Sequence, residues 1–167
     1  DSLKKLSRKY NLKKDISGVM LETFQGWGAV FYPNSYVKEI QNFCKKNDII
    51  LSFDEMQAGF GRTGLNFGFE HYKVDPDIIC CGKGMGGGVP LAGVLGKKKI
   101  MDLPNIGDMS STNSGNPLSC MAGIAVIDEL DKKKIVKNVR VKEEILLNNL
   151  ENIKNKYARF IKFVSAK

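Results

Sequence analysis

The sequence has little of what metal sites and disulfide frameworks require. It contains one histidine and four cysteines (Cys44, Cys80, Cys81 and Cys120), and no two cysteines form a CxxC pair. Structural zinc sites use four closely spaced cysteine or histidine ligands, so we expect no metal. Cys80 and Cys81 lie in an apolar run, where they are typical of small core residues in a reducing compartment. We therefore expect a cytoplasmic protein.

Long apolar runs are also absent, as are aromatic side chains interleaved with basic ones. No stretch approaches the roughly 18 apolar residues of a membrane span, so none is predicted. The net charge of +8 comes mainly from lysines mixed with Asp, Glu and Asn. This pattern favours solvated faces over a nucleic-acid interface. A second interpretation of the positive charge is that it attracts acidic small molecules such as phosphates.

Short apolar runs alternate with helical patterns along the first hundred residues. The runs at 17–24, 48–56, 77–82 and 91–96 predict strands, and the apolar spacing at 35–46 predicts a helix. Continuous apolar strands separated by helices are typical of a parallel sheet with both faces covered. The predicted fold class is α/β, with a mainly parallel sheet flanked by helices.

The second half of the chain is predicted to be helical. Asn116 is a candidate N-cap and Pro117 suits the first turn of a helix that continues to about residue 130. That helix is apolar nearly all round, so we expect it to be buried. An amphipathic helix is predicted at 136–157, and a strand begins after residue 159. Because the pattern stops there, we expect a piece of a larger fold.

Two charged residues follow predicted strands. Asp54 ends one apolar run and Lys83 follows another, within "GKGMGGG". In open α/β sheets, ligands bind at the carboxyl ends of the strands. A lysine there can act as a Schiff-base nucleophile, although an Asp and a Lys at strand ends more often form a structural ion pair. The glycines allow either a tight connection or close approach of a ligand.

Other motifs limit the kinds of ligand that the site could bind. The glycines of "GKGMGGG" follow the lysine, which is the reverse of a P-loop, so a nucleoside-triphosphate site is excluded. Thr112 precedes the helix that begins near Asn116, where hydroxyls and amides either bind a phosphate or simply cap the helix. His71 has no evident partner in the sequence, and we interpret it as a surface or packing residue.

Three motifs together resemble one family. "FDEMQAGFGRTG", "PDIICCGKGMGGGVPLAGVLG" and "SSTNSGNPLSC", in this order and at these separations, are similar to the class III aminotransferases. These are fold-type I, pyridoxal-phosphate-dependent enzymes such as ornithine, acetylornithine and 4-aminobutyrate aminotransferases. The resemblance runs from about Gly18 to Leu150. It implies that the chain is an incomplete large domain of a fold-type I transferase.

The resemblance also assigns roles to residues. Lys83 matches the lysine that forms the internal aldimine, a Schiff base with pyridoxal 5'-phosphate, and later moves a proton. Asp54 matches the aspartate that pairs with the pyridine nitrogen. Gln57 matches a residue near the phenolic oxygen of the ring. Thr112 matches a residue that reaches the cofactor phosphate of the neighbouring subunit, which implies a homodimer with shared sites. Glu22 matches a glutamate on the substrate side.

One departure from the family pattern concerns the substrate. The family's "QGEGG" reads "QGWGA" here, with Trp27 in place of the glutamate. In related enzymes that glutamate covers an arginine that otherwise binds the α-carboxylate of glutamate or 2-oxoglutarate. Trp27 cannot form this ion pair. We therefore expect an ω-amino acid or amine donor, with pyruvate as the 2-oxo acid acceptor.

The expected organisation is residues 1–135 as part of the cofactor-binding large domain, and 136–167 as a connecting helix and the start of the small C-terminal domain. We expect this segment to be inactive alone, because the family's aromatic stacking residue and substrate arginine are not visible in it. Two alternatives stay open: an aminomutase, racemase or decarboxylase on the same fold, and a non-catalytic module.

Overall fold

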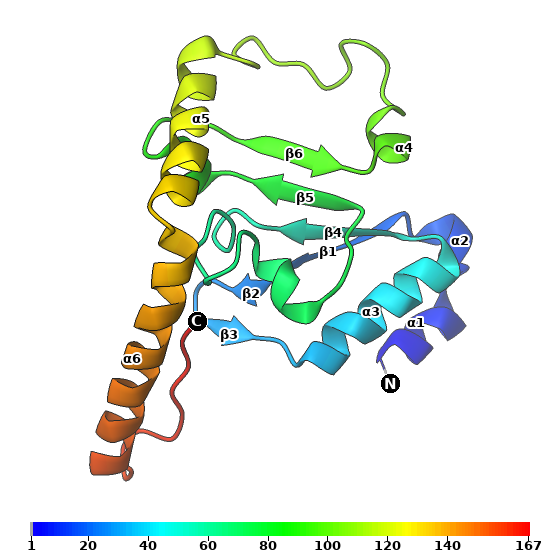
Figure 1. Ribbon diagram of the computed structural model, residues 1–167. Coiled ribbons are helices and arrows are strands. Elements are labelled where there is room, and N and C mark those ends of the chain that lie inside the picture. The colour runs from blue at the N-terminus through cyan, green and yellow to red at the C-terminus, as the bar shows by residue number, and fades with distance from the viewer. Residues whose placement is uncertain (1) are drawn as a thin grey trace.

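A four-stranded sheet in the order β1-β4-β5-β6 forms the centre of the computed structural model, which describes residues 2–167 (Figure 1). The strands are β1 (Gly18–Glu22), β4 (Ile50–Asp54), β5 (Ile78–Cys81) and β6 (Gly93–Gly96). Strands β1, β4 and β5 are parallel, and β6 is antiparallel to β5. The predicted α/β fold with a mainly parallel sheet is confirmed. The carboxyl ends of three neighbouring strands therefore meet at one edge.

Helices and a small hairpin complete the described chain. The α-helices are α1 (Ser2–Lys9), α2 (Leu12–Asp15), α3 (Asn34–Asn47), α4 (Lys98–Met101), α5 (Pro117–Lys132) and α6 (Ile135–Lys156). The 3₁₀ turns are η1 (Gly68–Tyr72) and η2 (Lys83–Gly86), and the hairpin pairs β2 (Phe24–Gln25) with β3 (Val30–Phe31). Within residues 2–167, no helix has the length and apolar character needed to cross a bilayer.

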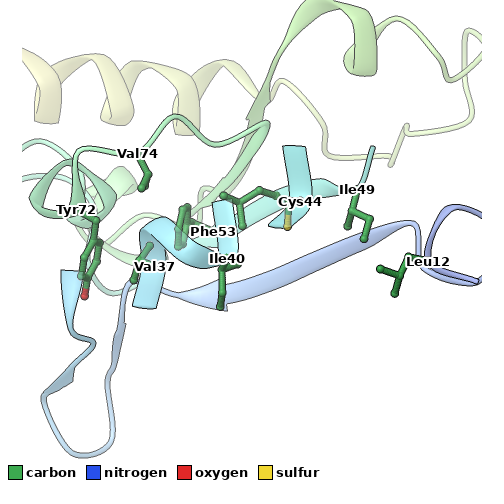
Figure 2. Close-up of a cluster of buried hydrophobic side chains, with 9 residues drawn as sticks. Leu12, Val37, Ile40, Cys44, Ile49, Phe53, Tyr72 and Val74 are labelled. Carbon is green, nitrogen blue, oxygen red and sulfur yellow. The ribbon is translucent and has the colours of Figure 1, made fainter. Parts of the chain in front are cut away.

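The hydrophobic core lies between α3 and the sheet (Figure 2). Val37, Ile40 and Cys44 recur at helical spacing on α3, and they are buried with Leu51 and Phe53 of β4. Burial of each large apolar side chain contributes roughly 1.5–3 kcal/mol. Side chains alternate between the two faces of a strand, so the last residue of β4 faces away from α3. The core thereby determines on which face of the sheet a polar site can form.

Helix α5 begins as predicted but is not buried. The side chain of Asn116 accepts hydrogen bonds from amides of the first turn, and Pro117 is the first helical residue. Among the described residues of the helix only Gly123 is buried, and Met121, for example, is 61% exposed. The helix contacts η2, where Gly123 packs close to Leu91, and its C-terminal part contacts α6 and the loop around Gly61. The outer apolar side has no covering element in residues 2–167.

Two further expectations can be compared with the structure. The predicted amphipathic helix is confirmed as α6, although none of its residues is buried. The strand expected after residue 159 is wrong, because residues 161–167 are irregular. This segment returns to the β2–β3 hairpin, where the hydroxyl of Ser165 donates to the carbonyl oxygen of Ala29 at 3.3 Å. A side-chain contact of this kind does not build a ladder of backbone hydrogen bonds.

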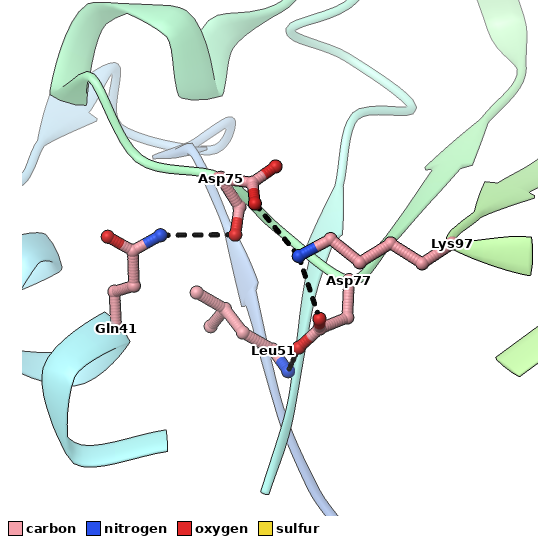
Figure 3. Close-up of polar contacts among 5 residues, drawn as sticks. All are labelled: Gln41, Leu51, Asp75, Asp77 and Lys97. Carbon is pink, nitrogen blue, oxygen red and sulfur yellow. Dashed lines mark hydrogen bonds and ion pairs between the residues drawn. The ribbon is translucent and has the colours of Figure 1, made fainter. Parts of the chain in front are cut away.

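A polar cluster fixes the register of β4, β5 and β6 at the edge opposite the carboxyl ends (Figure 3). The carboxylate of Asp77 accepts from the Leu51 amide at 3.0 Å and lies 3.1 Å from Nζ of Lys97. Lys97 also donates to Asp75 at 2.8 Å, and Gln41 donates to the Asp75 carbonyl at 3.1 Å. Burial alone would raise the pKa of Asp77, but these hydrogen bonds outweigh it and hold the pKa below its usual range.

Candidate functional site

Three residues predicted from the sequence meet at the carboxyl edge of the sheet. Glu22 ends β1 and lies in register with Asp54, which ends β4. Asp54 in turn lies in register with Cys80 of β5, and Lys83 begins the turn that follows this strand. The parallel pairing of the strands therefore places Glu22, Asp54 and Lys83 along one edge. This is the location at which open α/β sheets bind ligands.

Asp54 is oriented by its own backbone. One carboxylate oxygen accepts a hydrogen bond from the amide of Met56 at 2.8 Å, and the side chain is partly buried. Within residues 2–167, neither Asp54 nor Lys83 takes part in an ion pair. The structural ion pair that the sequence left open is thus not formed. A carboxylate and an amine stand at neighbouring strand ends without neutralising each other.

The backbone of Lys83 has an unusual conformation. Its φ is +45°, in the left-handed region, which costs a residue with a side chain roughly 1–2 kcal/mol. The side chain is exposed, whereas the residues of the preceding strand β5 are partly or fully buried. Strain of this kind persists where the surrounding structure enforces it, and it concentrates at functional sites. The turn therefore holds the backbone of Lys83 in a strained conformation at the edge of the sheet.

Two glycines around Lys83 pack closely against other parts of the chain. A Cβ on Gly82 would lie 2.4 Å from Sδ of Met56. Gly87 has a φ of +59°, and a Cβ there would lie 2.9 Å from Val126 of α5. These glycines allow η2 to fit between the turn after β4 and helix α5. Of the two interpretations of the glycine-rich motif, the tight connection applies at these positions.

Gln57 lies in the turn after β4, where its exposed side chain contacts the tip of the β2–β3 hairpin. The Cα of Gly26 is so close to the Gln57 amide that a Cβ on Gly26 would overlap it. The next residue, Trp27, is 84% exposed at this tip. The structure therefore brings the turn that carries Trp27 to Gln57, three residues beyond Asp54.

Thr112 does not lie at the end of a strand. It belongs to the exposed loop between α4 and α5, which runs outside the edge strand β6 (Figure 1). Hydrogen bonds between Ser111 and Ser114 hold this turn, and the hydroxyl of Thr112 has no hydrogen bond to any described residue. Within one chain, Thr112 is on a different element from the other predicted site residues and is free of a capping role.

Sequence reasoning missed Glu55. This side chain is fully buried, and its two carboxylate oxygens accept from the amides of Gly68 and Phe69, each at 2.8 Å. Burial raises the pKa of Glu55, and these two hydrogen bonds oppose the rise. The hydroxyl of Thr23 faces the carboxylate without completing a hydrogen bond of normal geometry. The available signal was a charged residue directly after Asp54, on the face of β4 that is otherwise apolar.

His71 and Cys81 also have defined environments. His71 is partly buried, and its Nε2 lies 3.0 Å from both the carbonyl and the hydroxyl oxygen of Thr63, so the expectation that it has no partner is wrong. Burial, with Lys167 nearby, lowers the pKa of His71. Burial, with the charge of Glu55, raises the pKa of Cys81 to about 11, so this thiol stays protonated and acts as a core residue.

Comparison with known proteins gives one consistent result. A family model described as aminotransferase class-III matches residues 1–167. Acetylornithine aminotransferase from Synechocystis sp. is 42% identical over 143 residues, which cover 85% of this chain and 33% of that protein. 4-Aminobutyrate aminotransferase from Mycobacterium leprae is 34% identical over 81% of this chain and 31% of that protein.

Solved structures agree with these relatives. An S-selective transaminase from Arthrobacter sp. with alanine bound superposes with a TM-score of 0.84 and 30% identity, over 93% of this chain and 34% of that one. An ornithine aminotransferase from Plasmodium yoelii gives a TM-score of 0.79 and 32% identity, over 92% and 40% of the two chains. The chain thus spans about a third of the length of the curated relatives it matches.

Proposed function

The chain belongs to the class III aminotransferases, and on this premise we propose that it carries the central part of the active site of a pyridoxal 5'-phosphate-dependent transaminase. The reaction would move an amino group from an amino acid or ω-amine donor to a 2-oxo acid. One observation carries the proposal. An amine and a carboxylate, Lys83 and Asp54, lie at neighbouring strand ends and are paired neither with each other nor with another described charge.

The residues present fit pyridoxal phosphate. The cofactor needs an amine at its aldehyde carbon and an acidic partner at its ring nitrogen, on opposite sides of the ring. The exposed Lys83 is available for the first role, and Asp54, oriented by the amide of Met56, is available for the second. Gln57, three residues beyond Asp54, would contact the ring near its phenolic oxygen. The strained backbone at Lys83 supports a fixed direction for the amine.

Each residue then has a defined task. Pyridoxal phosphate, when bound, supplies a conjugated ring that accepts the electron pair left on the substrate Cα. Asp54 would keep a proton on the pyridine nitrogen, because a nearby carboxylate favours the charged form of a base. Nζ of Lys83 would hold the cofactor in the resting enzyme and later accept the proton from the substrate Cα. Glu22, in register with Asp54, would face the substrate side.

Trp27 bears on the choice of substrate. It is an exposed indole at a hairpin tip beside Gln57, and it offers no carboxylate to pair with an arginine. We therefore propose an ω-amino acid or amine donor, with pyruvate as acceptor. The Arthrobacter transaminase, whose structure contains alanine, supports this choice as a related protein. Half-reactions of the full-length protein with glutamate, alanine and 4-aminobutyrate test it, and glutamate as the best donor would contradict it.

Thr112 supports a dimeric arrangement in which sites are shared. It lies on the exposed loop between α4 and α5, with its hydroxyl free of described partners. We propose that it reaches the cofactor phosphate in a second copy. On the same premise, residues 1–135 form part of the large domain, and 136–167 connect it to a small domain. The four free cysteines favour a reducing compartment such as the cytoplasm.

The decisive experiment replaces Lys83 in the full-length protein. Lys83→Ala should abolish transfer and the absorption band of the lysine-linked cofactor, because no other amine replaces Nζ. Lys99→Ala, which removes an exposed lysine from α4, is the matched control and should leave both unchanged. Amino transfer by Lys83→Ala at the rate of the unaltered protein would refute the assignment.

A further inference from the structure

Glu55 joins three parts of the site through its backbone and side chain. Its amide donates to the carbonyl oxygen of Cys80 at 2.9 Å, which ties the end of β4 to β5. Its carbonyl accepts from the amide of Gly59 at 2.9 Å and closes the turn that carries Gln57. Its carboxylate accepts from two amides at the start of η1. One residue thus contacts β5, the turn after β4 and η1.

The chemistry of this contact requires a carboxylate. Both amides of η1 point at Glu55, one to each oxygen, and the side chain is 0% exposed. A glutamine would still offer one oxygen, but its NH₂ group would face the second amide, donor against donor. A buried donor without an acceptor is unfavourable, so the start of η1 would move away from the strand. The arrangement is therefore specific to a group with two acceptor oxygens.

Its location connects this contact to the site. Glu55 follows Asp54 directly and precedes Gln57 by two residues, so a shift of its side chain moves the backbone that carries both. Besides burial, the negative charge of Glu55 raises the pKa of Cys81, which lies two residues before Lys83. The backbone amide of Glu55 bonds to β5, the strand that precedes Lys83.

We propose that Glu55 is a positioning residue, which anchors the end of β4 and the following turn so that Asp54 and Gln57 stay aligned with Lys83. The inference rests on the proposed transaminase function. It assigns no contact between Glu55 and substrate or cofactor. Its effect is transmitted through the backbone of the strand and turn.

Glu55→Gln in the full-length protein tests the proposal, with Glu70→Gln as the matched control. Glu70 lies in the same turn η1 and accepts from the amide of Phe67 at 3.2 Å. Glu70→Gln removes a charge from this turn but keeps an oxygen for the Phe67 amide, and it changes no contact with β4. We expect Glu55→Gln to lower kcat by about a hundredfold, the effect of a misplacement of about 1 Å, with KM for the donor nearly unchanged. Glu70→Gln should keep kcat within about threefold.

Two readouts that do not depend on turnover accompany the kinetics. Hydrogen exchange of the cofactor-free protein should become faster in residues 55–59 for Glu55→Gln but not for Glu70→Gln. The visible absorption maximum of the bound cofactor should shift only in Glu55→Gln. Equal losses of kcat in the two variants, or unchanged exchange at 55–59, would overturn the proposal, because Glu55 would then only stabilise η1.

The test separates this proposal from the one it rests on. If the unaltered protein shows neither cofactor absorption nor amino transfer, the proposed function fails. If the unaltered protein shows both, and Glu55→Gln has the same kcat and the same cofactor absorption, only the positioning role fails. Should Glu55→Gln not fold, Glu55→Asp keeps two acceptor oxygens on a shorter arm and is measured in the same way. A kcat for Glu55→Asp equal to that of the unaltered protein would then reject the positioning role, and a fall at unchanged KM would support it.

Discussion

Removal of the Asp77 carboxylate should loosen the central strands by a measurable amount. In Asp77→Ala the Leu51 amide loses a charged acceptor at 3.0 Å, which costs about 1.5–3 kcal/mol. The contact with Lys97 adds less than about 1 kcal/mol, because both side chains are partly exposed, at 36% and 22%. A total of about 2 kcal/mol corresponds to a roughly thirtyfold faster local opening.

The assay is hydrogen exchange of the peptide that covers residues 48–54. Asp77→Asn keeps an oxygen for the Leu51 amide and loses only the ion pair, so exchange should rise less than about fivefold. Asp75→Asn removes a carboxylate that is 71% exposed and serves as the surface control, with little change expected. Equal effects of Asp77→Ala and Asp75→Asn would refute the reasoning, since the amide bond would then contribute nothing.

The pH dependence gives an independent check of the same contact. The pKa of Asp77 is lower in the folded protein than its ordinary value, so the folded state favours the ionised form. Its stabilisation is complete above the unfolded pKa of about 3.9 and is lost as the pH falls through the folded pKa. The difference between the unaltered protein and Asp77→Ala should therefore be constant at neutral pH and shrink below about pH 3.9.

Three further changes have defined outcomes. Gly26→Ala should displace the Gln57 amide, which a new Cβ would overlap, and weaken cofactor binding with little change in melting temperature; unchanged affinity in a cofactor titration would contradict this. Asn116→Ala removes the cap of α5 and should lower the free energy of unfolding by about 1 kcal/mol in urea, whereas no loss would mean that the cap contributes nothing. Because burial lowers the pKa of His71, unfolding should become easier as the pH falls through about 6.5 and below. His71→Asn should flatten that part of the pH profile, and an unaltered slope would exclude His71 as its source.

The strand ends that carry the site were predictable because they depend on local signals. Apolar runs that end in a charged residue predict strand ends, and this rule alone placed Asp54 and Lys83 at one edge. Asn116 was recognised as a cap from the residue types around it. Nothing in the sequence indicated that β6 is antiparallel to β5. A short apolar run predicts a strand but does not indicate its direction relative to its neighbour.

Other features depend on residues that are distant in sequence. Glu55 binds amides 13 and 14 positions away, so only the folded chain shows that its charge has partners. The burial expected for α5 was wrong. Apolar composition shows that a helix has a surface suited to packing, but it does not show which element packs against that surface. Gln57 was predicted from resemblance, but its contact with Gly26 came from a hairpin whose position no local pattern specifies.

The left-handed backbone at Lys83 has an evolutionary consequence. Glycine and asparagine adopt this conformation at lower cost than lysine, so random substitution at position 83 towards either would relieve strain while removing the amine. Stability therefore favours glycine or asparagine at position 83, whereas the chemistry requires lysine. Lineages in which the reaction is no longer needed should drift first to glycine or asparagine here, and such descendants would melt at a higher temperature than their active ancestors.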